Sequence, residues 1–594
     1  MTAVSRKRSL VSWGAVGAAL LVLAGVGLLL ARRPASDAPV LGKRSAVTLD
    51  PGLEINPALS PDGKLVAYNR MTPSETRLVV QQLAGGEPVT VTQWPSLSGA
   101  MPAWSPQGDR LVYTSPLGLQ VIPALGGVSR LLVAQISGLG LRGRVTGVGW
   151  GSWAPNGEEV VYTSTDTVYT LSINTGTPKL LVKTLDPSSP VWSPDGQWIA
   201  YVSGNPAYVT VANLAPSSIW VVRAKGGTPV RITADRPLHA SPVWLPDSRS
   251  LLYISNQDGG RDVYFVRLSR SGAPAAGPVR MTTGLYPHTI SVSADGRRLV
   301  YAVHTETSNI VALTLQRGRS VSLRDAKPVT SGSQQIESFA VSPDGRWLVF
   351  DSNRNGNQDI WRMPLDRSAP PELLSAGPED EFQPTYSADG SLVSFHATRS
   401  GSTRDMYLIP AKGGPRTRIE VQTQNNLAPQ LSPDGRSVLY SEWGVRGEPR
   451  IEAARRSDEG WGRTTPLFTL SATWGEWSPD GKSLAFLRRT ALFRAEPDGE
   501  NPRQLLALPA GFSPLYMHWS DDSRLIYYSG IKVDGTYLIY EVPATGGNGR
   551  EIVHSEGPSY QNYRFNFRVH GRTLYTAFAD RQSDIWLAEV VSGK

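Results

Sequence analysis

The chain has 594 residues, of which 19% are charged and 8% aromatic, with 58 glycines, 46 prolines and a net charge of +8. This length exceeds what one hydrophobic core normally supports, and the composition is that of a globular protein with many turns. There is no cysteine, which excludes disulfides, Cys-ligated zinc, iron–sulfur clusters and a cysteine nucleophile. After residue 33 no block of Lys and Arg is interleaved with aromatic residues, so we expect no nucleic-acid partner.

The N-terminus carries an apolar run from Trp13 to Ala31, between basic residues at 6–8 and at 32–33. A helix needs about 20 such residues to cross a bilayer, and this run is close to that length. A cleavable signal peptide normally has a shorter apolar core, and here two arginines stand where a cleavage site is expected. We therefore expect residues 1–33 to form a signal-anchor or transmembrane helix, with a cleaved signal peptide as the alternative. In either case the remainder lies on the periplasmic or extracytoplasmic side.

A repeat fills nearly everything after residue 50. Its unit is a small or Pro residue, an aromatic or aliphatic one, the turn Ser-Pro-Asp-Gly and an apolar stretch. Successive turns lie between 39 and 52 residues apart, and a period of about 40–50 residues with only strand-type segments predicts four-stranded β-propeller blades. We count twelve copies, at Asp62, Gln107, Asn156, Asp195, Asp247, Asp295, Asp344, Asp389, Asp434, Asp480, Asp522 and His570.

The residues within the unit suit a crowded blade. Pro, Asp and Gly together supply a fixed φ, a side-chain hydrogen bond to the backbone and a tolerance of positive φ, so they turn the chain sharply. The following segment, as in residues 65–68, is continuously apolar and predicts a strand buried on both faces. Gly-Gly pairs such as Gly413-Gly414 predict hairpins before the outer strand. Six pre-turn positions hold tryptophan, which we interpret as a wedge between blades, with a stacking platform for a ligand as the alternative: Trp104, Trp153, Trp192, Trp244, Trp477 and Trp519.

The unit Ser-Pro-Asp-Gly-x-x-apolar-Ala-aromatic, as in residues 60–68, resembles the repeat of TolB-type propellers, the periplasmic component of the Tol–Pal system. It also resembles the propeller regions of prolyl-oligopeptidase-like proteins. The Ala-x-Gly-Gly hairpins, as in residues 411–414, are similar to the sensor regions of some bacterial transmembrane Ser/Thr kinases. The resemblance spans residues 47–594 and implies an all-β fold.

Twelve blades exceed the four to eight of a typical ring, so we expect two β-propellers. The six-bladed TolB type favours a six-plus-six grouping, and seven plus five is the rival. The expected domains are residues 1–33 (signal anchor or transmembrane helix), 34–46 (linker), 47–325 (first propeller) and 326–594 (second propeller). The last blade lacks an evident outer strand, and residues 327–330 are expected to supply it, which removes an open edge.

Catalytic motifs are absent from the sequence. No Gly-x-Ser-x-Gly elbow, P-loop, His-Glu-x-x-His motif or Rossmann glycine pattern is found. We therefore assign no catalytic, cofactor-binding or metal-binding residue and expect no cofactor. Polar residues seven or eight positions before the turns are expected to line the channels, where they contact water or, alternatively, a cation or small ligand: Glu54, His239, His288, Glu337, Glu381 and Asn426.

Two metal sites remain as alternatives. His239 and His288 stand in consecutive blades and would share a metal such as Mn²⁺ if their rings converged. Residues 351–359 place Asp351, Asn353, Asn355 and Asp359 around a glycine, like a short calcium loop, although a plain hairpin explains the same spacing.

These observations favour a non-catalytic cell-envelope scaffold that binds a protein, peptide or glycan partner near the membrane, to which the N-terminal helix attaches it. One alternative is an enzyme of polysaccharide lyase or hydrolase type, with His239 and His288 in the channel. Another is the detached sensor half of a signalling system.

Overall fold

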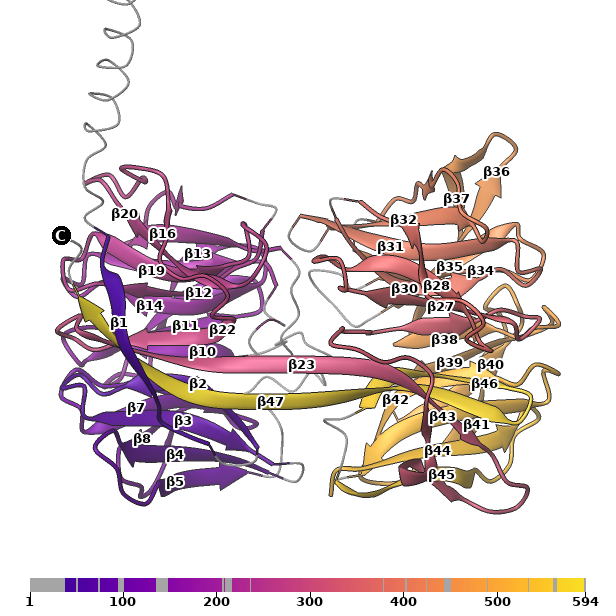
Figure 1. Cartoon of the computed structure of the whole chain (residues 1–594), viewed down its shortest axis with the longest axis horizontal. Coiled ribbons are helices and arrows are strands. Elements are labelled where there is room, and N and C mark those ends of the chain that lie inside the picture. Colours follow the sequence, from indigo (N-terminus) through magenta and orange to yellow (C-terminus); the bar gives the residue numbers. More distant parts are fainter. Residues whose placement is uncertain are drawn as a thin grey trace, which may run out of the picture.

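A computed structural model shows the architecture of the chain (Figure 1). It describes residues 38–591 apart from positions 50–51, 73–74, 95–100, 135–147, 206–207, 209–215, 235–236, 378, 401–402, 424, 443–449, 489, 533 and 559–562. Within these residues no helix has the length and apolar character needed to cross a bilayer. The predicted anchor, residues 1–33, lies outside the described part.

The described chain folds into two β-propellers. Five blades of the first ring are each built from four consecutive antiparallel strands, which run from the channel outward. They are β2–β5 (Leu53–Leu59, Leu65–Met71, Thr76–Gln82, Val89–Trp94), β6–β9 (Ala103–Trp104, Arg110–Ser115, Gly118–Pro123, Arg130–Ala134), β10–β13 (Val148–Trp153, Glu159–Ser164, Thr167–Ser172, Pro178–Lys183), β14–β17 (Pro187–Trp192, Trp198–Ser203, Ser218–Arg223, Val230–Arg231) and β18–β21 (His239–Trp244, Ser250–Ser255, Asp262–Arg267, Val279–Arg280).

Five blades of the second ring have the same construction. They are β26–β29 (Phe339–Val341, Trp347–Ser352, Asp359–Pro364, Glu372–Ser375), β30–β33 (Asp380–Tyr386, Leu392–Ser400, Thr403–Pro410, Thr417–Ile419), β34–β37 (Asn426–Leu431, Ser437–Glu442, Arg450–Ser457, Gly460–Ser471), β38–β41 (Trp474–Trp477, Leu484–Arg488, Ala491–Ala495, Arg503–Ala507) and β42–β45 (Phe512–Trp519, Leu525–Lys532, Thr536–Pro543, Arg550–Pro558). A short strand, β24 (Val321–Ser322), adds to β45, and the 3₁₀ turn η1 (Leu323–Asp325) follows it.

The sixth blade of each ring is composite. Two long strands, β23 (Arg298–Thr314) and β47 (Thr573–Val591), pair antiparallel along their whole shared length and run from one ring into the other (Figure 1). In the first ring they lie between β22 (Pro287–Val292) and β1 (Val40–Ala46). In the second ring they lie between β46 (Tyr563–His570) and β25 (Lys327–Pro328). Each ring therefore closes with strands from distant parts of the sequence.

This arrangement confirms the all-β fold with two six-bladed rings in the described part of the chain, and it refines the expected boundaries. Residues 40–46, expected within a linker, form β1 because β47 offers them an unpaired edge. The end of β47 pairs in the first ring, so residues after about 580 do not belong with the second ring as the 326–594 range implies. Residues 327–328 do supply the outer strand of the last blade, as predicted.

The repeated turn has the hydrogen bonds that its residues predict. In the copy at Asp344, Ser342 Oγ donates to the carboxylate at 2.5 Å and accepts from the backbone N–H of Trp347 at 2.9 Å. Gly345 has a φ of 69°, a conformation that an L side chain rarely adopts. The Ser342 hydroxyl is also the main cause of a lowered pKa at Asp344.

Tryptophans at the pre-turn position join neighbouring blades. The indole N–H of Trp104 donates to the carbonyl of Ala58 in the preceding blade at 2.8 Å. Trp153, Trp244 and Trp519 make the same kind of bond to Ala103, Val191 and Glu476. This supports the interpretation of these side chains as wedges, since a buried indole N–H needs an acceptor.

Candidate functional site

The innermost strands all begin at the side of their ring that faces the other ring. Pro287 at the start of β22 pairs with Val303, which is where β23 leaves the first ring. Tyr563 at the start of β46 pairs with Phe578, just before β47 leaves the second ring. The two channel mouths therefore face each other (Figure 1). The polar residues singled out in the sequence lie at or next to these strand starts, as expected.

A β-bulge follows the start of many innermost strands. The register shifts there, and a non-glycine residue takes a positive φ between 48° and 56°: Asn56, Ser189, Ser241, Gln383 and Ala428. Bulges bend a strand and change the direction in which side chains point. The mouth residues just before each bulge are thus placed by a repeated backbone feature.

In the first ring the predicted mouth residues are buried within the protein. Glu54 receives a hydrogen bond from Arg70 Nε at 3.1 Å, and its backbone carbonyl accepts from Ser583. His239 packs edge-on against Tyr253, and both of its ring nitrogens lack a partner among the described residues. Burial lowers the pKa of His239 to about 3, so the ring is neutral at physiological pH.

His288 does not pair with His239 but with a residue that the sequence did not indicate. Its ring lies 5.2 Å from that of His304 in β23 and 4.8 Å from that of Tyr208. Arg261, also buried, donates to the Tyr208 hydroxyl at 3.4 Å and to the His304 carbonyl at 2.9 Å. Burial lowers the pKa of His304 despite the nearby Glu306. These residues form an aromatic and cationic cluster at the first mouth.

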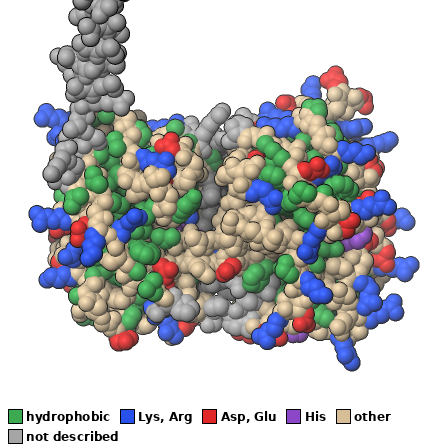
Figure 2. All heavy atoms as spheres, viewed as in Figure 1, with side chains coloured by type: hydrophobic (Ala, Val, Ile, Leu, Met, Phe, Trp, Pro, Cys, Tyr) green, Lys and Arg blue, Asp and Glu red, His purple; other side chains and the backbone are tan. Residues whose placement is uncertain are grey.

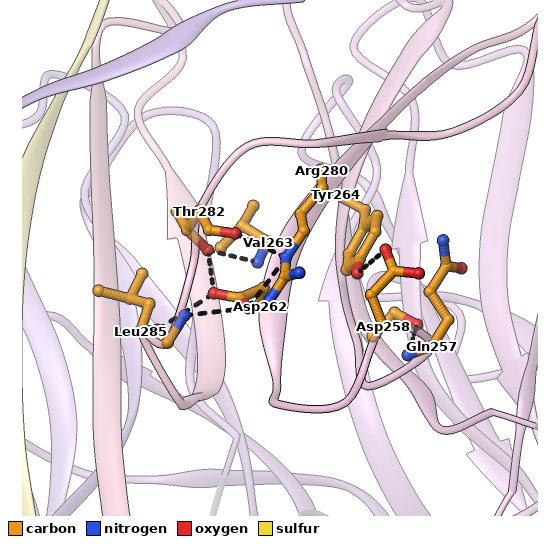
Figure 3. A network of polar contacts seen from close by, with 10 residues as sticks. Gln257, Asp258, Asp262, Val263, Tyr264, Arg280, Thr282 and Leu285 are labelled. Carbon is orange, nitrogen blue, oxygen red and sulfur yellow. Dashed lines mark hydrogen bonds and ion pairs between the residues drawn. The ribbon is translucent and has the colours of Figure 1, made fainter.

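A buried carboxylate fixes the segment that leads into β22 (Figure 3). Asp262, at the start of β20, accepts from Thr282 Oγ1 at 2.6 Å and from the N–H groups of Gly284 and Leu285 at 3.1 Å. Arg280 supplies its counter-charge. A carboxylate that accepts several hydrogen bonds is well satisfied away from water, so Asp262 holds residues 282–285 in place just before His288.

In the second ring the mouth is acidic. Asp351 is buried and accepts from the N–H groups of Glu337, Ser338 and Gln383, at 2.6, 3.0 and 3.1 Å. Burial and the neighbouring Glu337 raise its pKa to about 7. Because Ser338 and Gln383 belong to adjacent blades, Asp351 ties these two blades together.

Glu381 is the second buried acid of this mouth. It accepts from Ser375 Oγ at 3.0 Å and from Arg416 at 2.8 Å, while its Oε2 has no partner among the described residues. Burial raises its pKa to about 7, even though Arg416 opposes the shift. Asn426, by contrast, is bonded to Thr423 next to it in sequence.

Neither alternative metal site is assembled as the sequence suggested. The described residues contain no group of three or more His, Asp or Glu side chains arranged to hold a metal ion. In the proposed calcium loop, Asp351 is occupied by backbone amides and Asn353 Oδ1 accepts from Gln335 N–H at 2.8 Å. Asp351–Ser352 and Asp359–Ile360 are paired between β27 and β28, so this segment is a hairpin.

A groove of about 600 Å³ lies beside the first blade of the second ring, between residues 328–334 and 367–371. Two arginines and no carboxylate line it. Arg354 stacks on Trp361 at 4.8 Å and binds Gln334, and burial lowers its pKa. Arg367 reaches across to the carbonyl of Pro328. Among the described residues the hydrogen bonds of Arg354 and Arg367 go to neutral oxygens and not to a carboxylate, so the groove presents two positive charges.

Sequence reasoning identified the mouth positions but missed Tyr208, Arg261, His304 and Arg354. None of them stands at a fixed offset from a turn, so the repeat frame gave no reason to select them. The only available signal was chemical: a histidine at 304, directly after the apolar segment 299–303.

Comparisons with known proteins agree with the architecture. A family model described as the TolB beta propeller domain, PD40, matches residues 42–218, 151–333 and 320–467. An uncharacterized protein of Agrobacterium fabrum is 27% identical over 270 residues, which cover 42% of this chain and 85% of that protein. The Tol-Pal system protein TolB of Francisella tularensis is 26% identical over 226 residues, 37% of this chain and 48% of the relative.

The alignment thus spans about half the length of that TolB relative. Among solved structures, a putative TolB from Agrobacterium tumefaciens matches with a TM-score of 0.37 and 17% identity, covering 46% of this chain and 99% of its own. The matched residues, 42–467, cover most of the first ring and about half of the second. The chain belongs to the TolB β-propeller family of PD40 repeat proteins.

Proposed function

We propose that this protein is a non-catalytic scaffold of the cell envelope that binds a protein, peptide or glycan partner near the membrane. The observation that carries the proposal is the ribbon of β23 and β47, which couples the two rings and holds their channel mouths opposite each other. A continuous pair of strands resists bending much better than a flexible linker. Such a rigid pair of rings presents a partner with a preformed surface, which lowers the entropic cost of binding.

The chemistry of the two mouths supports recognition of a partner that has polar groups of both signs. The first mouth has the buried cation Arg261 beside Tyr208, and the second has the acids Asp351 and Glu381. The cationic groove at Arg354 and Arg367 adds a third contact region on the second ring. Location in the envelope and attachment through residues 1–33 rest on the apolar run in the sequence.

The enzyme alternative needs His239 and His288 to act on one substrate. The His288 imidazole instead packs against Tyr208 and the His239 imidazole against Tyr253. His239 is also buried and neutral. No contact in the described structure brings the two imidazoles together, so this alternative gains no support. The other alternative, the detached sensor half of a signalling system, differs from a scaffold in the kind of partner it binds. Identifying the captured partner therefore separates these two functions.

Capture from membranes tests the proposal. The full chain with a C-terminal affinity tag is cross-linked in its own cells, purified from the membrane fraction and analysed by mass spectrometry. We expect one or a few envelope components to be enriched over a control in which both groove arginines are changed, R354Q with R367Q. Recovery of the protein outside the membrane fraction, or turnover of a glycan panel without any captured partner, would overturn the proposal.

A further inference from the structure

One face of the first ring collects the repeated turns and the Gly-Gly hairpins; we name it the turn face. In the second blade, Ala124 at the hairpin donates to the carbonyl of Asp109 at the turn, at 2.9 Å. Ala224 and Gln197 make the same contact in the fourth blade. The innermost strands start at the opposite side, so the turn face points away from the second ring.

Both ends of the described chain lie at this turn face. Val40 at the start of β1 pairs with Val591 at the end of β47. Val590 donates to the carbonyl of Arg297, which belongs to the turn of the composite blade, at 2.8 Å. Figure 1 shows β1 and the arrowhead of β47 together at the outer side of the first ring. Any segment before residue 38 therefore departs from this face.

Exposed aliphatic side chains form a row at the same face, across three neighbouring blades. Val40 and Val591 belong to the composite blade, Val89 to the next blade, and Leu125 and Val128 to the one after that. Leu125 is 69% exposed and Val128 90%. The hairpin between them approaches the blade of Val89, because a Cβ on Gly126 would lie 3.5 Å from the carbonyl oxygen of Val91. We call these five residues the aliphatic row. Figure 2 shows, in green, hydrophobic side chains on the surface of the first ring.

The other hairpins of the repeat show that this row is not required by the fold. The position of Leu125 is occupied by Ala84, Lys225, Lys412 and Thr545 in the equivalent hairpins. The position of Val128 is occupied by Glu87, Thr228, Pro415 and Asn548. These hairpins have the same pair of positive-φ glycines, so the turn forms without aliphatic side chains. Two highly exposed aliphatic residues at a hairpin tip therefore indicate that this part of the protein contacts another apolar surface.

The distance to a bilayer is set by the sequence before β1. If residues 1–33 span the membrane, as in the function proposed above, seven peptide steps separate Arg33 from Val40. Even a fully extended chain covers only about 25 Å over that length. The turn face of the first ring then lies next to the headgroups, and it is the face from which the chain departs.

We propose that the aliphatic row docks the turn face of the first ring onto the lipid surface, with Leu125 and Val128 inserted among the headgroups. This inference rests on the proposed membrane anchor and adds an orientation to it. The ring axis stands upright on the bilayer, and the second ring, with its acidic mouth and cationic groove, is held farther away. Aliphatic side chains at an interface gain free energy by leaving water for the boundary of the acyl chains.

The absence of cysteine makes the test direct, because a single introduced cysteine is labelled uniquely. The full chain carrying L125C is labelled with an environment-sensitive fluorophore and reconstituted into vesicles of phosphatidylcholine and phosphatidylglycerol. K412C is the matched control: it occupies the same hairpin position in the second ring, whose turn face points away from the first. Both side chains are exposed or partly exposed on hairpins, so neither substitution removes a core contact.

We expect the label at position 125 to shift to shorter wavelength and to lose most of its emission to a headgroup-depth lipid quencher, while the label at 412 keeps its emission. V128C serves as an independent second position and should match L125C. If the protein floats with the vesicles but positions 125 and 128 are quenched no more than 412, the docking is wrong and the anchor stands. If the protein does not float at all, the anchor itself fails.

Discussion

Ser583 donates a hydrogen bond from its hydroxyl to the backbone carbonyl of Glu54 at 2.7 Å, across 529 positions of sequence. The same residue is the β-bridge partner of Leu53 in β2. This contact joins the last strand of the chain to the first blade of the first ring. Around it, Val300 and Ile585 pack with Val66 and Tyr68 in a shared apolar cluster.

Truncation of the chain after Ala579 should open the first ring while leaving the second closed. The deleted residues form the third strand of the first ring's composite blade, whereas β46 keeps its pairing with residues 573–578. We expect calorimetry to show a separate unfolding transition at lower temperature. Limited proteolysis assigns this transition to the first ring if the second ring stays protected while the first is cleaved. Truncation after Val591 is the control and should melt like the full chain. A single unchanged transition after truncation at 579 would contradict the role given to β47.

The inter-blade tryptophans should contribute differently to stability, depending on whether their indole N–H is hydrogen-bonded. Trp104→Phe removes the bond to the Ala58 carbonyl and leaves that acceptor unsatisfied, so we expect it to cost about 1–3 kcal/mol beyond the lost packing. Trp192 occupies the same repeat position, but its indole N–H has no partner in the described structure. Trp192→Phe is therefore the matched comparison and should be the milder change in urea unfolding. Equal losses would show that the indole bonds contribute nothing.

The acidic mouth predicts an unusual dependence of stability on pH. Burial raises the pKa of Glu381 and of Asp351 to about 7, so the folded protein holds protons that the unfolded chain releases near pH 4. Stability of the second ring should therefore fall as the pH rises from about 4 through about 7. Glu381→Gln removes one of these groups and keeps an acceptor for Ser375 and Arg416.

We expect this variant to lose less stability than the wild type between pH 5 and pH 8, with a difference of up to about 3 kcal/mol. The turn carboxylates do not interfere, because their lowered pKa values place their contribution below that window. Chemical unfolding at several pH values measures the difference. Identical pH profiles for the two proteins would refute the raised pKa at Glu381.

The groove arginines should matter more for binding than for folding. Arg354→Gln with Arg367→Gln removes two positive charges whose hydrogen bonds in the described structure go to neutral oxygens, so a captured acidic partner should dissociate about 10-fold faster or more. The melting temperature should change by only a few degrees at most. Arg223→Gln, at a stacked arginine of the first ring, is the control substitution. Undiminished capture by the double variant would exclude the groove as a contact.

The sequence predicted most of the blade because each blade is a local structure. Asp344 and its neighbours form their turn with residues at most five positions away, and such short-range chemistry is visible in a single chain. The channel positions of His239 and Glu381 followed from the same frame, since a fixed distance from the turn fixes the place along a strand. The outer strand at Lys327 was also found, because an unpaired edge requires a partner.

The rest depended on contacts that no local pattern encodes. Residues 304–309 are all polar and show no alternation that would predict a strand, but residues 304–310 pair with residues 577–583, more than 260 positions away. His304 reaches His288 because β23 pairs with β22 as far as Val303 and continues beyond it, and the turn frame gave no reason to select that position. The buried Arg261 was equally hidden, because its two hydrogen-bond partners, Tyr208 and His304, come from separate segments.

The ribbon of β23 and β47 also has a topological consequence. His304 lies opposite Ser583 in the paired strands β23 and β47. A short loop from His304 to Ser583 would therefore complete the first propeller without residues 305–582. The second propeller is therefore an insertion in a hairpin of the first, and its own termini stand side by side at the entry point. Removal of residues 305–582 with such a loop would therefore leave every blade of the first ring with its strands.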